Sequence, residues 1–338
     1  MNLISPRRVL ALAVVALGLL AAPSAQAFPY QPITGTQFFT PDGVWNKPLA
    51  TNAPLGSNSK QLSSMLSWEA GYYGSYINTA SYSAPVYTVA SDQPNVHVTL
   101  DVNNTQLAAD LNQVPLPPDA RPASGTDGHL VVWQPSTQTM WEFWRLYKDG
   151  SGNWHAGYAG KMSNVSSNPG YFQAPFGATA SGLPLVGGLM TLQEETDGVI
   201  NHALAISVPH PKAGTFVFPA QKTDGDSTSS YAIPEGTRFR LPASLNIDAL
   251  NLPRQTAMMA KAAQKYGMVV NDRGGAVAFK AEDPYLYTQQ FGFDPYGPGN
   301  GATPISFYYA KDMKPEGLGA GTERGRLGAG ADERLLVE

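Results

Sequence analysis

Two short stretches of the sequence carry side chains that could transfer protons or stabilise charge. They contain Asp127, His129, Glu142 and Arg145 in the first stretch, and Glu194 and His202 in the second. Carboxyl and imidazole groups are common general acids and bases, and a guanidinium stabilises developing negative charge. Trp133 and Trp144 also lie in the first stretch, and indoles stack on sugar rings. This combination is suited to chemistry on an oligosaccharide.

Two reactions are compatible with these residues. In a glycoside hydrolase, Glu142 and a glutamate of the second stretch such as Glu194 would be the acid and base. In a uronate lyase, His129 or His202 would remove the proton beside the uronate carboxylate. Arg145 or a neighbouring donor would then stabilise the charge that develops.

A metal site and purely structural roles are the other interpretations. Asp127, His129, Glu142 and His202 form a set that could bind a divalent ion. Asp-x-His spacing is common, so we keep the metal as a minor alternative and otherwise expect no cofactor. A single histidine in a strand is more often an ordinary hydrogen-bonded residue, and tryptophans in strands are more often core residues.

The first stretch is predicted to be a β-hairpin. Residues 129–133 and 140–147 are rich in β-branched and aromatic side chains, and they flank Pro135-Ser-Thr-Gln138. A turn with an even number of residues places Val131 opposite Glu142. His129 and Glu142 would then point to the same face of the hairpin, as diagonal neighbours roughly 6–8 Å apart.

The second stretch is also predicted to be a hairpin. Residues 189–195 and 199–206 would be its strands, with Thr196-Asp197-Gly198 or Asp197-Gly198 as the turn. The first turn brings Glu194 onto the face of His202, and the second brings Glu195 there. In both cases a carboxylate lies on the histidine's face.

Further strands are predicted at intervals along the chain, and one helix is well marked. The strand candidates are residues 85–89, 96–100, 215–218, 238–241, 268–271 and 276–280. Pro253 suits the first turn of the helix, and Gly267 can end it. The sequence therefore predicts a mainly β domain, a β-sandwich or jelly roll with one packed helix.

Composition excludes several classes of protein. The chain has 338 residues with 22 Lys and Arg, 26 Asp and Glu, and no cysteine. The formal net charge of −4 makes a nucleic-acid partner unexpected, and a chain without cysteine has no disulfide and no thiolate nucleophile. Phosphate-binding loops, His-Glu-x-x-His, Gly-x-Ser-x-Gly and dinucleotide-binding glycine patterns are absent from the sequence.

The two ends of the chain differ from the middle. Arg7 and Arg8, the apolar run 9–22 and Ala25-Gln26-Ala27 have the order of a secretory signal peptide, which is too short to span a bilayer. We expect a signal peptide (1–27), a wrapping N-terminal segment (28–83), a β-sandwich domain (84–314) and a disordered tail (315–338). Within the N-terminal segment, residues 28–67 are expected to contain no helix. The mature protein would be a secreted or cell-envelope monomer with no membrane span.

A resemblance to a known family supports the choice of residues. Asp127-Gly-His129, Trp141-Glu-Phe-Trp144, Glu194 and Ile200-Asn-His-Ala-Leu204 are similar to the markers of a family of secreted bacterial, actinobacterial-type proteins of uncharacterised function. The resemblance covers about Trp45 to Asp283 and implies an association with the cell envelope or with carbohydrates. The family often has Asp where this chain has Gln193, and an apolar segment where this chain has its charged tail.

The expected function follows from the aromatic and acid–base residues together. We expect a secreted enzyme that cleaves an extracellular or cell-wall polysaccharide, by hydrolysis or by uronate elimination. The catalytic set would be His129, Glu142, Glu194, His202, Asp127 and Arg145, and the sugar-stacking residues Trp133 and Trp144. The alternative is a glycan-binding or envelope-associated protein without catalytic activity.

Overall fold

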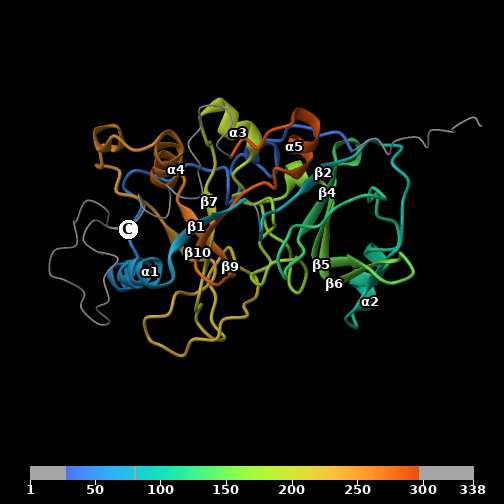
Figure 1. Ribbon diagram of the computed structural model, residues 1–338. Helices are drawn as coiled ribbons and strands as arrows, with labels where there is room; N and C mark the ends of the chain where they lie inside the picture. Colours follow the sequence, from blue (N-terminus) through green and yellow to red (C-terminus); the bar gives the residue numbers. More distant parts are fainter. Residues whose placement is uncertain (1–27, 80, 297–338) are drawn as a thin grey trace, which may run out of the picture.

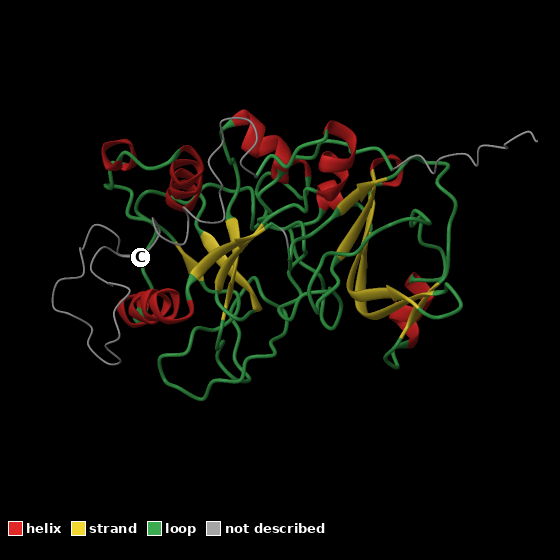
Figure 2. Ribbon diagram, viewed as in Figure 1, coloured by secondary structure: helices red, strands yellow, loops and turns green. Residues whose placement is uncertain are grey.

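The structure is a computed structural model that describes residues 28–79 and 81–296. The predicted signal peptide (1–27) and the predicted tail (315–338) lie outside the described residues. Within them, the chain forms two mixed five-stranded sheets that lie side by side and are joined by long loops (Figure 1, Figure 2). The prediction of a mainly β, sandwich-like fold is confirmed.

The first sheet is built from strands that are far apart in the sequence. Its order is β1 (Ser75–Asn78), β10 (Val277–Lys280), β7 (Leu204–Val208), β9 (Met268–Arg273) and β8 (Arg238–Phe239). β1 pairs in parallel with β10 and β7 in parallel with β9, whereas the other two pairs are antiparallel. Because β1 belongs to this sheet, the segment 28–83 is part of the fold and not only a wrapping around it.

The second sheet contains the hairpin predicted from residues 129–147. Its order is β2 (Val86–Thr88), β4 (Leu130–Gln134), β5 (Thr139–Lys148), β6 (Trp154–Met162) and β3 (Val98–Leu100). Val131 pairs with Glu142, and Gln138 closes the turn in the left-handed region with φ of 51°. The predicted register and the turn Pro135 to Gln138 are therefore confirmed, which places His129 and Glu142 on one face by alternation.

The prediction of a single helix is incomplete. The predicted helix is α4 (Arg254–Lys265), which packs on β7 and ends before Gly267. The expectation that residues 28–67 contain no helix is wrong, because α1 (Ser59–Tyr73) begins at Ser59. Its serine-rich sequence hides a narrow buried stripe of Leu62, Leu66 and Ala70 at helical spacing. The remaining helical segments are α2 (Thr105–Asp110), α3 (Leu192–Asp197), α5 (Tyr285–Phe291) and the 3-10 turns Gly35–Gln37, Pro135–Thr137, Val165–Ser167 and Ile247–Leu250.

The prediction of a second hairpin is wrong. Residues 192–197 form α3, which begins at a capping box in which Thr191 accepts from the Glu194 amide and the Glu194 side chain accepts from the Thr191 amide. Gly198 ends the helix with φ of 79°. The local Thr-x-x-Glu signal therefore prevails over the apolar alternation. Residues 215–218 also form no strand and make only an isolated bridge from Phe216 to Glu235.

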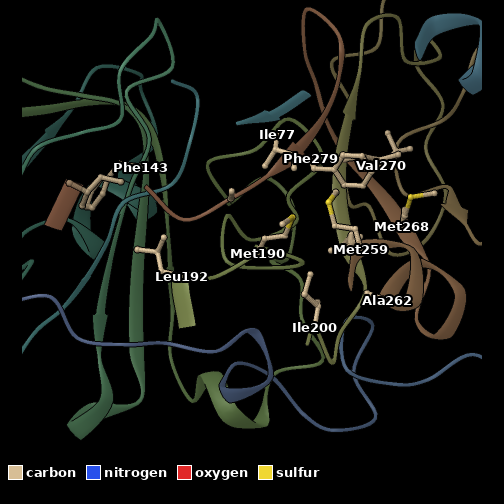
Figure 3. Packing of buried hydrophobic residues seen from close by; sticks show 14 of the residues in the cluster. Ile77, Phe143, Met190, Leu192, Ile200, Met259, Ala262, Met268, Val270 and Phe279 are labelled. Carbon is tan, nitrogen blue, oxygen red and sulfur yellow. The ribbon is translucent and has the colours of Figure 1, made fainter. Parts of the chain in front are cut away.

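An apolar core joins the two sheets. Val131, Trp133 and Met140 of the second sheet belong to the same buried cluster as Ala205 and Val269 of the first. A second cluster packs α4 on the first sheet and continues toward β5 through the segment before α3 (Figure 3). The labelled members of this second cluster are Ile77, Phe143, Met190, Leu192, Ile200, Met259, Ala262, Met268, Val270 and Phe279.

The stability of this core is tested on β5. Phe143 is fully buried, so Phe143→Ala should lower the free energy of unfolding by about 3–5 kcal/mol through lost contacts and a residual cavity. Tyr147→Ala, four residues along the same strand and 45% exposed, should change it by less than about 1 kcal/mol. Urea denaturation measures both, and equal losses would contradict the described burial of β5.

Candidate functional site

Glu142 lies on the face of β5 that is directed toward the first sheet, and it is fully buried. One carboxyl oxygen accepts from the Ala178 amide at 2.7 Å and the other from the Leu185 amide at 2.8 Å. Desolvation by burial raises the pKa of Glu142 to about 7, although these two amides and Lys222 oppose the rise. Glu142 therefore fastens the loop 177–185 to the sheet.

A β-bulge in β9 sets the direction of a second buried carboxylate. Ile206 pairs with Val270, but Ser207 pairs with Asp272, so Asn271 is an extra residue in β9. Asp272 takes the face that Asn271 would occupy in a regular ladder. Bulges redirect side chains in this way, and they are frequent next to active sites.

Asp272 meets a buried lysine of β10, which lies on the other side of β7 in the first sheet. The Lys280 ammonium, on β10, lies 3.4 Å from one carboxylate oxygen of Asp272, and both side chains are nearly buried. The other Asp272 oxygen accepts from the Ala180 amide at 3.2 Å. The loop 177–185 is thus hydrogen-bonded to both sheets, to Glu142 of the second sheet and to Asp272 of the first.

Glu235 and Lys222 extend this group of charges. Glu235 is fully buried, and neither oxygen has a well-aligned hydrogen-bond partner among the described residues. Burial raises the pKa of Glu235 to about 8; Asp272 and Asp224 raise it further, and the nearby Thr223 hydroxyl opposes the rise. Burial lowers the pKa of Lys222. The carboxylates Glu142, Asp272 and Glu235 oppose this decrease. Its ammonium donates to the Gly177 carbonyl at 3.1 Å.

His129 is the last of the polar side chains enclosed between the sheets. Burial lowers the pKa of His129 to about 3, and Lys280 lowers it further, so the ring is neutral. Its Nδ1 has no hydrogen-bond partner within the described part of the chain. We call this set the inter-sheet polar cluster, and its members are His129, Glu142, Lys222, Glu235, Asp272 and Lys280.

Glu194 and His202 form a separate buried pair. His202 Nε2 lies 3.0 Å from Glu194 Oε1, and His202 Nδ1 donates to the Ala203 carbonyl at 2.7 Å. Both ring nitrogens face acceptors. Burial alone would lower the pKa of His202, but Glu194 and this carbonyl outweigh burial and raise it. The sequence thus predicted a glutamate beside this histidine, leaving Glu194 and Glu195 as alternatives, but not the helix that provides it.

The pair holds three segments of the chain together. Glu194 Oε1 also accepts from the Gly35 amide at 3.1 Å, and Gly35 lies so close that a Cβ there would be 2.1 Å from His202 Nε2. The pair joins α3 and the 3-10 turn at Gly35 to the start of β7. Its enclosure by protein groups favours a structural role over the predicted catalytic one.

The remaining predicted residues divide between core and surface. Trp133 is 4% exposed and packs edge-on against Phe38, so the expectation of an open stacking surface there is wrong. Trp144 is half-buried and donates to Asp127 at 3.3 Å, and the exposed Arg145 lies over its ring at 5.3 Å. The predicted site is therefore not one constellation.

The metal hypothesis finds no matching geometry. His202 is paired with Glu194, whereas His129 and Glu142 belong to the inter-sheet polar cluster. Among residues 28–79 and 81–296, no group of three or more His, Asp or Glu side chains is arranged to hold a metal ion.

Sequence reasoning missed Lys222, Glu235, Asp272 and Lys280. Two of them could have been noticed from the sequence. Asp272 and Lys280 are charged residues at the ends of two mostly apolar strand segments, which begin at Met268 and Val277. The bulge that turns Asp272 inward leaves no such signal.

Comparison with family models, with curated proteins and with solved structures gives no match. The site is therefore interpreted from its own geometry.

The close approach at Gly35 makes a sharp test of the Glu194–His202 pair. Gly35→Ala should destabilise the protein by about 3 kcal/mol, because the added methyl group overlaps the His202 ring. Gly150→Ala is the control, since a Cβ there meets nothing within 4 Å. Thermal and urea unfolding measure the difference, and equal stability of the two variants would contradict the described packing.

The buried carboxyl groups predict how stability depends on pH. Between about pH 6.5 and 8, native Glu235, with its pKa of about 8, holds a proton that the unfolded chain, with its value of 4.5, has lost. Stability should therefore fall as pH rises through this window, on the order of 1–2 kcal/mol for this group. Native His129 is neutral throughout this window, whereas the unfolded histidine, with its pKa of 6.5, is half protonated at pH 6.5, so this residue adds only a small opposite contribution. Urea midpoints at both pH values should show a smaller decline in Glu235→Gln; an unchanged decline would refute the assignment.

Proposed function

We propose that the protein is a secreted enzyme that cleaves an extracellular or cell-wall polysaccharide, with the exposed carboxylates Asp224 and Asp226 as its acid–base pair. The observation that carries the proposal is that these neighbouring carboxylates have opposite surroundings. Such a difference separates the proton donor from the ionised partner in glycoside hydrolases. The proposal thus keeps the reaction class expected from the sequence and moves its centre to a different loop.

Asp224 has the surroundings of a proton donor. Burial raises the pKa of Asp224, and Asp272 of the inter-sheet polar cluster raises it further. Arg273 opposes this rise, and Asp226 adds to it. The residue is nevertheless exposed, so a glycosidic oxygen can reach it. Through Asp272, the enclosed cluster would act on the reaction by favouring the protonated form of this surface carboxyl.

Asp226 faces two basic side chains. One of its carboxylate oxygens lies 2.7 Å from an Arg273 guanidinium nitrogen, and the other lies 3.3 Å from His210 Nδ1. In hydrolysis this carboxylate would activate a water molecule or attack the sugar ring.

The turn between the two aspartates depends on glycine. Gly225 lies between them, and a Cβ at Gly225 would be 2.2 Å from the Lys212 carbonyl oxygen. Its amide also donates to the Thr223 hydroxyl at 3.0 Å. Close packing against the backbone at Lys212 thus fixes the turn between the proposed acid and its partner.

Binding without cleavage is the second candidate function. It is favoured by the enclosure of His129, Glu142, Glu194 and His202, which leaves four of the residues expected to be catalytic without contact with solvent. None of the described helices is long and apolar enough to cross a membrane. Export through the predicted signal peptide is part of the proposal and fits an extracellular glycan as the ligand.

Turnover of the two aspartate variants separates the candidates. Asp224→Asn and Asp226→Asn should each lower the rate of polysaccharide cleavage by about a hundredfold or more, the usual effect of removing a positioned proton-transfer group. Asp248→Asn is the control, because Asp248 is an exposed carboxylate paired with Lys261. Reducing ends and the absorbance of unsaturated uronates are followed in parallel.

The pH profile supplies a second outcome of the same experiment. Activity should be lost on the alkaline side as Asp224 loses its proton. Asp272→Asn should move that loss to lower pH, because Asp272 raises the pKa of Asp224. Full activity in both aspartate variants would eliminate this site, and the absence of turnover in the parent protein would leave the binding function.

A further inference from the structure

Three aromatic side chains at the end of α1 form an exposed surface beside the proposed catalytic loop. Trp68 and Tyr72 are stacked with ring centroids 5.2 Å apart and an interplanar angle of 13°, and Tyr73 packs edge-on against Tyr72 at 4.7 Å. Although the rings cover one another in part, Trp68 is 40% exposed and Tyr72 is 58% exposed. We call Trp68, Tyr72 and Tyr73 the aromatic platform.

The sequence places these rings together through helical spacing. Residues four apart on a helix lie on one face, which brings Tyr72 next to Trp68. Leu62, Leu66 and Ala70 form the buried stripe of the same helix, which packs against β10. The platform is therefore on a side of α1 that the fold of the described residues does not use for its core.

A continuous chain of contacts links the platform to Asp226. The Tyr73 hydroxyl lies 2.9 Å from His210 Nε2, and the two rings are 5.5 Å apart. His210 Nδ1 in turn faces Asp226, which also binds Arg273. The aromatic surface and the proposed acid–base pair are consequently parts of one region of the molecule.

Glu69 is a buried carboxyl group in this region. It lies next to Trp68 in the sequence and is fully buried, and neither of its carboxyl oxygens has a well-aligned hydrogen-bond partner among the described residues. Burial raises the pKa of Glu69 to about 7, and the His210 backbone amide opposes the rise. Glu69 and Tyr73 thus both interact with His210, which connects this buried carboxyl group to the same region.

We propose that the aromatic platform is a binding subsite for a neutral glycan, with pyranose rings stacked on Trp68 and Tyr72 and the chain directed toward Asp224 and Asp226. The proposal rests on the proposed function and adds its substrate class. Exposed aromatic groups bordered by polar side chains are a frequent form of ligand site.

The charges beside the platform select a neutral sugar over a uronate. Both basic groups along the contact chain, His210 and Arg273, already face Asp226. Asp224, the proposed proton donor, adds no positive charge to this edge. A polyuronate would therefore find no unpaired basic group along this chain of contacts, whereas the hydroxyl groups of a neutral sugar can donate hydrogen bonds to the carboxyl oxygens. The platform thus favours hydrolysis over uronate elimination.

Binding is measured on the Asp224→Asn variant, so that the glycan stays intact. Affinity electrophoresis and calorimetry use soluble neutral polysaccharides and their hexasaccharides, with polygalacturonate as the charged probe. At least one neutral glycan should bind, and Trp68→Ala or Tyr72→Ala in this background should weaken its affinity about tenfold or more, as expected when a central aromatic contact is removed. Polygalacturonate should bind more weakly than that glycan.

Tyr147→Ala is the matched control. Tyr147 is also exposed and stacks on a histidine, His155, with centroids 5.3 Å apart, but it belongs to the second sheet. Its removal should leave glycan affinity unchanged. Circular dichroism and urea midpoints establish that the platform variants are folded, and Trp68→Phe should retain part of the affinity because an aromatic face remains.

Several outcomes would overturn the subsite. They are failure of every neutral glycan to bind, preference for polygalacturonate, equal loss in Tyr147→Ala, and dimerisation of the protein that Trp68→Ala abolishes in sedimentation experiments. Failure of the proposed function gives a different result. If binding depends on Trp68 while the parent protein cleaves nothing, the platform holds and the catalytic assignment falls.

Discussion

The desolvation of charged groups between the two sheets is the constraint on which the rest of the structure depends. A carboxylate or ammonium removed from water is tolerated only when other polar groups satisfy it or when it becomes neutral. The structure uses both solutions. Glu142 accepts two backbone amides and Asp272 faces Lys280, whereas Glu235 has a pKa raised to about 8 and is therefore mostly protonated at neutral pH.

The polar interior explains how two sheets with long connections keep one arrangement. The loop 177–185 is held from the second sheet by Glu142 and from the first by Asp272. Hydrogen-bonded polar groups accept fewer alternative geometries than apolar contacts do, because distance and direction both matter. The apolar clusters around them supply most of the favourable free energy of folding, and the polar contacts fix how the loop lies between the sheets.

The sequence predicted the hairpin 130–148 well because its determinants are local. Alternation and the turn from Pro135 to Gln138 are enough to place Glu142 opposite Val131. It left open whether Glu194 or Glu195 faces His202, and it expected a strand where the Thr191 capping box forms a helix. It did not indicate Asp272, because a bulge at Asn271 is settled by pairing with β7, nor Asp224 and Asp226, whose surroundings come from distant segments.

The inter-sheet polar cluster keeps Glu235 protonated near neutral pH, and Asp272 of the same cluster raises the pKa of the surface residue Asp224. The most direct measurement is a pH titration of the carboxyl carbon signals of protein labelled with 13C-glutamate, with the Glu235 signal assigned by its absence from Glu235→Gln. The account predicts a midpoint at about pH 8 for Glu235. A midpoint near the ordinary glutamate pKa of about 4.3 would show that water solvates this carboxyl, and would contradict the account.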